Sequence, residues 1–123
     1  MPRLKERLRE LYAQEENQKR LAAYDKATSE PDQLAAELTR VYPVVAARLA
    51  ELATRLEANE RTIEHINVRG LPAGSERLLT AEMVARGLTG FVVKGTDIPR
   101  ITKSLRLPAL RFDMHAPYEW PRS

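Results

Sequence analysis

The apolar pattern of residues 31–69 is the feature that most restricts how this chain can fold. Apolar side chains recur there at steps of three and four residues, which is the spacing of one helix face. At a rise of about 1.5 Å per residue, such a helix is roughly 55–60 Å long. A compact globule of this chain's length is only about 35 Å across. We therefore expect this helix to protrude, to pack on a long partner helix or to assemble with other copies.

The apolar face of this helix has the spacing of a coiled-coil seam. From Leu49 onward the steps alternate between three and four residues, which is a heptad pattern, and Asn59 occupies a core position. A buried Asn at such a position specifies register or strand number at a cost in stability. The predicted oligomer seam consists of Leu34, Leu38, Val41, Val45, Leu49, Leu52, Leu56, Asn59, Ile63 and Ile66.

A further helix is predicted over about 3–28, where leucines recur at helical spacing. The two helices are separated by a predicted break, because Thr28 or Ser29 can cap a helix and Pro31 suits its first turn. The pair would form an antiparallel hairpin. Since a two-helix hairpin has too little core to be stable alone, we expect it to form a homo-oligomer.

After Gly70 the pattern becomes short and mixed, which predicts a small α+β module. The elements expected in it are a helix over 81–86 capped by Thr80, a strand over 91–94 and a helix that Asp97 caps and that runs to about Leu105. They are followed by a strand over 110–112, a turn over 114–117 and a segment over 118–120 that pairs back. The predicted fold is mainly α, with a helical hairpin or coiled coil at 1–69, a linker at 70–79 and the module at 80–123.

The composition restricts the classes of function. The chain has no cysteine, which excludes disulfides, thiolate metal sites and a cysteine nucleophile. No apolar run approaches the roughly 20 residues that span a bilayer. The first residues lack the apolar stretch of a secretory signal. We therefore expect a cytoplasmic protein that does not contact a membrane.

Few residues are candidates for catalysis or metal binding. Asp113 and His115 are two residues apart, but a metal site normally needs three or four protein ligands and no third ligand is visible. Asp113, His115 and Glu119 could form an acid–base set, yet nothing in the sequence places a nucleophile beside them. The sequence therefore predicts no enzyme, no metal and no cofactor.

The segment 98–106 is the candidate for nucleic-acid contact. The net charge of the chain is +3, and all of the excess lies in its C-terminal part. If 98–106 is a helix, Arg100, Lys103 and Arg106 share one face, and Thr102 can donate to a phosphate. The alternative is an ordinary solvated polar face on a small amphipathic helix.

Two stretches near this segment resemble one DNA-binding family. Leu-Leu-Thr-Ala-Glu-Met-Val-Ala at 78–85 and Leu-Pro-Ala-Leu-Arg-Phe at 107–112 look like the start and the wing of excisionase-type winged helix-turn-helix domains. The sequence departs from that pattern at 90–95, where a tight turn is expected. The resemblance implies that a second helix, at 98–106, enters the major groove. Together with a coiled coil that spaces two basic modules over successive half-sites, it predicts a dimeric DNA-binding protein with a degenerate winged helix-turn-helix-like module at 78–120.

Aromatic residues gather near the C-terminus, at Phe112, Tyr118 and Trp120. They could anchor another protein, since Trp and Tyr dominate interface hot spots. Alternatively, they close the small core of the module. The function that the sequence predicts first is a non-enzymatic assembly or adaptor protein, whose coiled-coil arm sets the oligomeric state and whose C-terminal module binds a partner. Dimeric DNA binding is the alternative.

Overall fold

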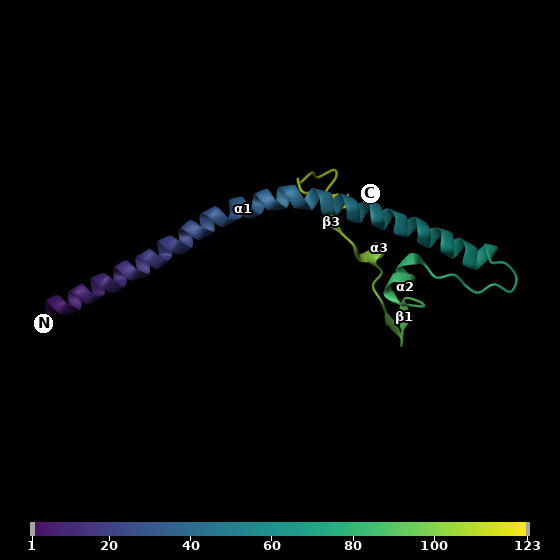
Figure 1. Ribbon diagram of the computed structural model, residues 1–123, viewed down its shortest axis with the longest axis horizontal. Coiled ribbons are helices and arrows are strands. Elements are labelled where there is room, and N and C mark those ends of the chain that lie inside the picture. Colours follow the sequence, from purple (N-terminus) through teal and green to yellow (C-terminus); the bar gives the residue numbers. More distant parts are fainter. Residues whose placement is uncertain (1, 123) are drawn as a thin grey trace. The chain divides into compact units, whose positions relative to one another are not determined.

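The structure is a computed structural model that describes residues 2–122 (Figure 1). Its helices are α1 (Pro2–His65), a π-helical turn η1 (Ile66–Gly70), α2 (Ala81–Arg86) and α3 (Ile101–Ser104). Its strands are β1 (Val92–Val93), β2 (Thr96–Asp97), β3 (Leu107–Pro108) and β4 (Tyr118–Trp120). No helix among these residues is both long and apolar enough to cross a membrane. The predicted long helix followed by a small region of short helices and strands is confirmed.

The chain divides into two compact units after Val41. The first unit is the N-terminal part of α1, and every described side chain from Arg3 to Val41 is exposed. The helix continues through residues 28–31, so the predicted break there is wrong. Thr28 and Ser29 donate their hydroxyls to the carbonyls of Asp25 and Lys26 and therefore do not cap a new helix.

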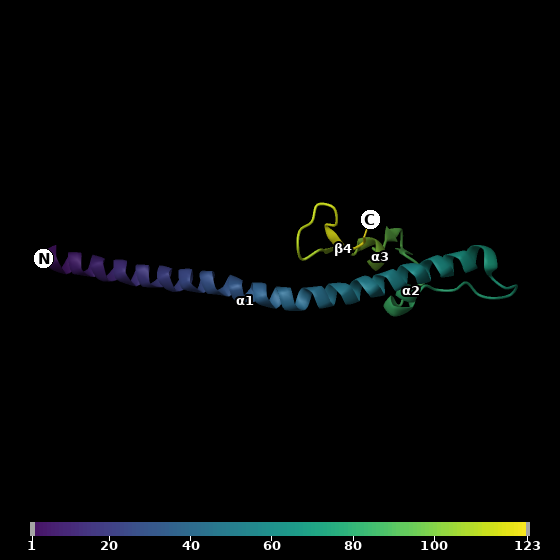
Figure 2. The same ribbon diagram turned by 90° about the horizontal axis from the view of Figure 1, so that it is seen from above.

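The second unit begins with Tyr42 and contains the remainder of α1. After Gly70 the chain turns back and runs along this part of α1, as in a hairpin, but the returning leg is not a second long helix (Figure 1). Figure 2 shows α2 and β4 on opposite flanks of α1. The antiparallel pair of helices predicted from 3–28 and 31–69 is therefore corrected to one helix and a short mixed return.

The core of the second unit lies where the returning chain meets alanines of α1. Ala53, Leu107 and Trp120 are buried together, and Ala50 and Leu105 pack against them. An alanine adds only a methyl group to the helix surface, so the returning backbone and the Trp120 ring can approach α1 closely. The core therefore depends on side chains that are far apart in the sequence.

Helix α2 forms as predicted, because its caps are local. The Thr80 hydroxyl accepts a hydrogen bond from the Met83 amide at 3.3 Å. At the other end Gly87 has φ +66, the left-handed conformation that ends helices and that glycine adopts without strain.

The strand predicted at 91–94 is β1, which pairs antiparallel with β2. The two strands are joined by Lys94 and Gly95, both with positive φ as in a tight two-residue hairpin turn. Asp97 lies in β2, so its predicted role as a helix cap is wrong. Helix α3 begins only after Arg100 and has a single turn, so the predicted helix over 97–105 is much shorter than expected.

The last two strands form a second hairpin. Leu107 pairs with Trp120, and Pro108 pairs with Tyr118, across the turn that was predicted near 114–117. The prediction of a strand at 110–112 is wrong, because these residues belong to the loop between β3 and β4. The strand that pairs with β4 is β3, which lies earlier in the sequence. The predicted pairing back of residues 118–120 is confirmed.

We predict that Leu107→Ala destabilises the second unit by about 2–5 kcal/mol, because it leaves a cavity beside Trp120. The measurement is urea unfolding followed by fluorescence, for which Trp120 is the only tryptophan. Phe112→Ala is the matched control, since Phe112 is 83% exposed and its loss is expected to change stability by less than about 0.5 kcal/mol. Equal midpoints for the two variants would contradict this core.

Candidate functional site

Polar side chains along α1 and η1 hold the returning chain in place. Each of them meets a residue that is at least eleven positions away in the sequence, so together they tie the short elements to one scaffold. The contacts join Tyr42 Oη to the Pro108 carbonyl, Trp120 Nε1 to Thr54 Oγ1, the Ala81 amide to Asn59 Oδ1, Thr102 Oγ1 to Glu60 Oε1, and the Asn67 side-chain amide to the Leu78 backbone.

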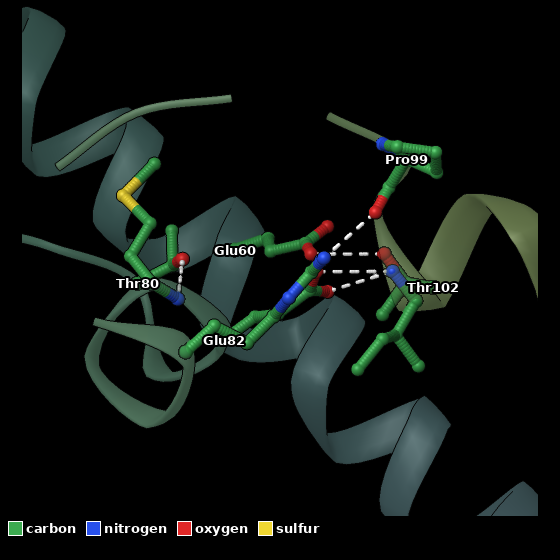
Figure 3. Close-up of polar contacts among 8 residues, drawn as sticks. Glu60, Thr80, Glu82, Pro99 and Thr102 are labelled. Atoms are coloured by element: carbon green, nitrogen blue, oxygen red, sulfur yellow. Dashed lines mark hydrogen bonds and ion pairs between the residues drawn. The ribbon is translucent and has the colours of Figure 1, made fainter. Parts of the chain in front are cut away.

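A buried carboxylate joins α2 to α3. Glu82 is only 2% exposed, and both of its oxygens lie 3.0 Å from the amide nitrogen of Ile101, the first residue of α3 (Figure 3). Arg86 donates to Glu82 at 2.7 Å and also to the Pro99 carbonyl at 2.8 Å. The negative charge is therefore compensated by a cation and by the backbone donor of a helix start.

A second buried carboxylate joins α3 to α1. Glu60 accepts a hydrogen bond from the Thr102 hydroxyl at 2.9 Å, and both residues are buried (Figure 3). In the described part of the chain, no buried side-chain nitrogen or oxygen lacks a partner. Glu60 and Glu82 therefore act in this arrangement as fastenings between helices.

The cluster predicted for nucleic-acid contact is divided. Arg100 lies over the Phe91 ring, 4.3 Å from its centroid, and its Nη1 is 3.5 Å from a Glu64 carboxylate oxygen. The Thr102 hydroxyl faces Glu60, so it is not presented to solvent. Only Lys103 and Arg106 are exposed. The recognition helix implied by the family resemblance is a single turn in the structure.

The predicted oligomer seam is divided as well. Its last four positions are half-buried beneath the chain's own returning leg, and Asn59 accepts a hydrogen bond from the Ala81 amide at 2.8 Å. The side-chain oxygen of Asn59 therefore already has a hydrogen-bond partner within its own chain. The seam positions that are exposed are Leu34, Leu38 and Val41 in the first unit and Val45, Leu49 and Leu52 in the second. The half-buried ones are Leu56, Asn59, Ile63 and Ile66.

The three aromatic residues predicted as a partner anchor do not form one cluster. Trp120 is 6% exposed and belongs to the core, whereas Phe112 is 83% exposed in the loop between β3 and β4. Tyr118 is partly exposed on β4. The same loop exposes Met114 at 79%, which the sequence analysis did not select. Phe112 and Met114 are thus the most exposed large apolar side chains of this loop, and Leu110 is exposed to a lesser degree.

Asp113 and His115 have a local structural role in the same loop. The Asp113 carboxylate accepts a hydrogen bond from the His115 amide at 2.9 Å, and the Asp113 carbonyl accepts one from Ala116. These bonds close the turn below the exposed Met114. Within residues 2–122, no three side chains of His, Asp or Glu gather around a possible metal position.

The sequence did not indicate the roles of Glu60, Glu82 and Asn67, whose side chains make several of the hydrogen bonds that hold the short elements in place. A glutamate on a predicted helix looks the same whether it is solvated or buried. The one available signal was the position of Glu82 two residues after the Thr80 cap, where a carboxylate suits the first turn of a helix. Its bond to Ile101 is nineteen residues away and has no local sequence signature.

Comparison with known proteins adds no family to this geometry. No family model, no curated protein and no solved structure matches the chain. A function is therefore inferred from the exposed apolar side chains and from the distribution of charge on the described residues.

We predict that Glu82→Ala destabilises the second unit by about 1.5–3 kcal/mol, because the Ile101 amide and Arg86 lose a charged acceptor. Glu82→Gln, which keeps an acceptor oxygen, is expected to cost less. Glu76→Ala is the control, since Glu76 is exposed. The measurement is again urea unfolding followed by Trp120 fluorescence. A Glu82→Ala protein as stable as the Glu76→Ala control would show that this fastening contributes nothing.

Proposed function

We propose that the protein is a non-enzymatic assembly or adaptor protein, in which the N-terminal part of α1 associates with another helix and the C-terminal module presents a binding surface. The helix carries the self-association, so the protein acts as a homo-oligomer. This proposal rests on one observation: the whole first unit is a helix whose large apolar side chains are exposed.

The apolar side chains of the first unit have no cover within it. The six leucines there are between 51% and 64% exposed, and Tyr12, Tyr24 and Val41 are exposed as well. Burying a leucine side chain is worth about 1.5–3 kcal/mol. An amphipathic helix gains most of its stability from packing of its apolar face, so a helix of this kind is favoured when a partner covers that face. The six leucines are Leu4, Leu8, Leu11, Leu21, Leu34 and Leu38.

The loop between β3 and β4 supports the adaptor part of the proposal. Phe112 and Met114 are exposed on a loop whose ends are joined by a hydrogen bond from the Ala109 amide to the Pro117 carbonyl at 2.9 Å. An aromatic side chain held on a closed loop loses little conformational entropy when it enters a pocket. This loop is therefore the surface on which we expect a second protein to bind.

We predict that Leu34→Glu combined with Leu38→Glu weakens self-association at least tenfold, because two charges enter the apolar face. Glutamate and leucine are both good helix formers, so the helix is retained, which circular dichroism checks. The measurement is light scattering of the full chain over a range of concentrations. The matched control is Gln33→Glu combined with Thr39→Glu, which adds the same charge beside the leucines. Equal effects of the two pairs, or a wild-type monomer at every concentration, would contradict the proposal.

Dimeric DNA binding is the second candidate, and the exposure of Lys103 and Arg106 is the observation that favours it. If it operates, the protein binds random duplex DNA at low salt, and binding falls steeply as salt rises. Replacing both residues by Ala is expected to weaken that binding about tenfold or more, whereas Arg20→Ala with Lys26→Ala in the first unit leaves it unchanged. Fluorescence anisotropy measures both. Absence of binding at low salt removes this candidate.

A further inference from the structure

The two ends of the first unit carry opposite charge. Four of the residues from 3 to 9 are basic and one is acidic, whereas residues 30–37 contain three acidic residues and no basic one. All of these side chains are exposed, and no ion pair of the described structure involves residues 3–41. The basic residues are Arg3, Lys5, Arg7 and Arg9, opposed by Glu6, and the acidic ones are Glu30, Asp32 and Glu37. These charges are therefore free to meet a partner.

This distribution selects one orientation for two copies of the helix. In a parallel, in-register pair, the basic ends lie side by side and so do the acidic ends, which is repulsive at both places. In an antiparallel pair, each basic end lies against an acidic end. We infer that the partner of residues 3–41 is a second copy of this chain, bound antiparallel. This inference rests on the self-association proposed above and adds the identity and direction of the partner.

Leucines of the two ends lie at matching heights in the antiparallel arrangement. The offset that sets Leu8 level with Leu34 of the second copy also sets Leu4 level with Leu38. At the same offset Lys5 is level with Glu37, and Leu21 is level with Leu21 of the second copy. Leucines therefore recur at matching heights toward both ends of the pair, and the two-fold axis passes near Leu21.

A second copy fits this surface better than a partner of uniform charge. Residues 3–41 contain as many acidic as basic side chains, so a strongly acidic or strongly basic helix would be attracted at one end and repelled at the other. An antiparallel pair of identical helices uses the same surface twice and closes on itself, as two-fold interfaces do. Such a pair is therefore expected to be a closed dimer.

Charge reversal tests the direction of the pair. Lys5→Glu with Arg7→Glu makes the basic end acidic, and Glu30→Lys with Glu37→Lys makes the acidic end basic. Each double variant alone is expected to dimerise about tenfold more weakly, because like charges then face each other in the antiparallel pair. The fourfold variant restores opposite net charges, −1 against +1 in place of +3 against −3, and is expected to regain part of the association. A parallel pair would instead be strengthened by either double variant, because the net charge that faces itself falls from three to one in magnitude.

Cysteine cross-linking gives an independent readout. The chain contains no cysteine, so Glu15→Cys and Ala27→Cys each introduce a single thiol on an exposed position. Position 15 follows Leu11 by four residues and position 27 precedes Leu34 by seven, so each lies on the same side of the helix as those leucines. In the proposed pair, position 15 of one copy is level with position 27 of the other. In a parallel pair these positions are about 18 Å apart, and position 15 is level with position 15. A mixture of the two full-length variants, treated with a short thiol cross-linker, is expected to give the mixed dimer.

The outcomes separate this inference from the proposed function. A dimer in light scattering that links position 15 to position 27 supports both. An oligomer that links position 15 to position 15, or that links neither pair and grows with concentration, keeps self-association but overturns the antiparallel partner. A monomer at all concentrations overturns both. Circular dichroism of each variant confirms that the helix is intact, so loss of association is not confused with loss of folding.

Discussion

The second unit depends on the contact between the alanine-bearing face of α1 and the side chains of Leu107 and Trp120. The short helices and strands after Gly70 are too small to enclose a core of their own, and their apolar side chains are buried only where α1 supplies the other wall. Burial of apolar area is the main favourable term in folding. Few apolar side chains are buried in this unit. The hydrogen bonds that polar side chains between Tyr42 and Asn67 make with the returning chain therefore determine which short element contacts which turn of the helix.

The two units differ in how the apolar side chains of α1 are covered. In the second unit, α1 covers part of its apolar surface with the chain that follows it, and the positions from Leu56 to Ile66 become half-buried. In the first unit no such cover exists among the described residues, and the leucines stay exposed. One helix thus contains a stretch that is used for internal packing and a stretch that is available for assembly. This division is the basis of the proposal that the protein is built to associate.

The elements that could be predicted from the sequence are those with local causes. The helix over 81–86 follows from Thr80 and Gly87, which cap it from directly adjacent positions. The pairing of 118–120 was also anticipated. Prediction failed where a residue has two plausible local roles: Thr28 and Ser29 bond backward within α1, and Asp97 joins a strand. The buried glutamates could not be found, because their partners are nineteen and forty-two residues away.

The hydrogen bonds between the C-terminal elements and α1 determine how much of the gene must be transferred together for this structure to form. A segment cut at Gly70 would leave behind Tyr42, Thr54, Asn59 and Glu60, the residues that receive the returning chain. The gene segment that encodes a complete folding unit is therefore longer than the apparent module. Recombination that transferred the β-hairpins without the preceding helix would produce a segment that does not fold. Any gene fusion that keeps this architecture has to transfer the helix from Tyr42 onward together with everything that folds back upon it.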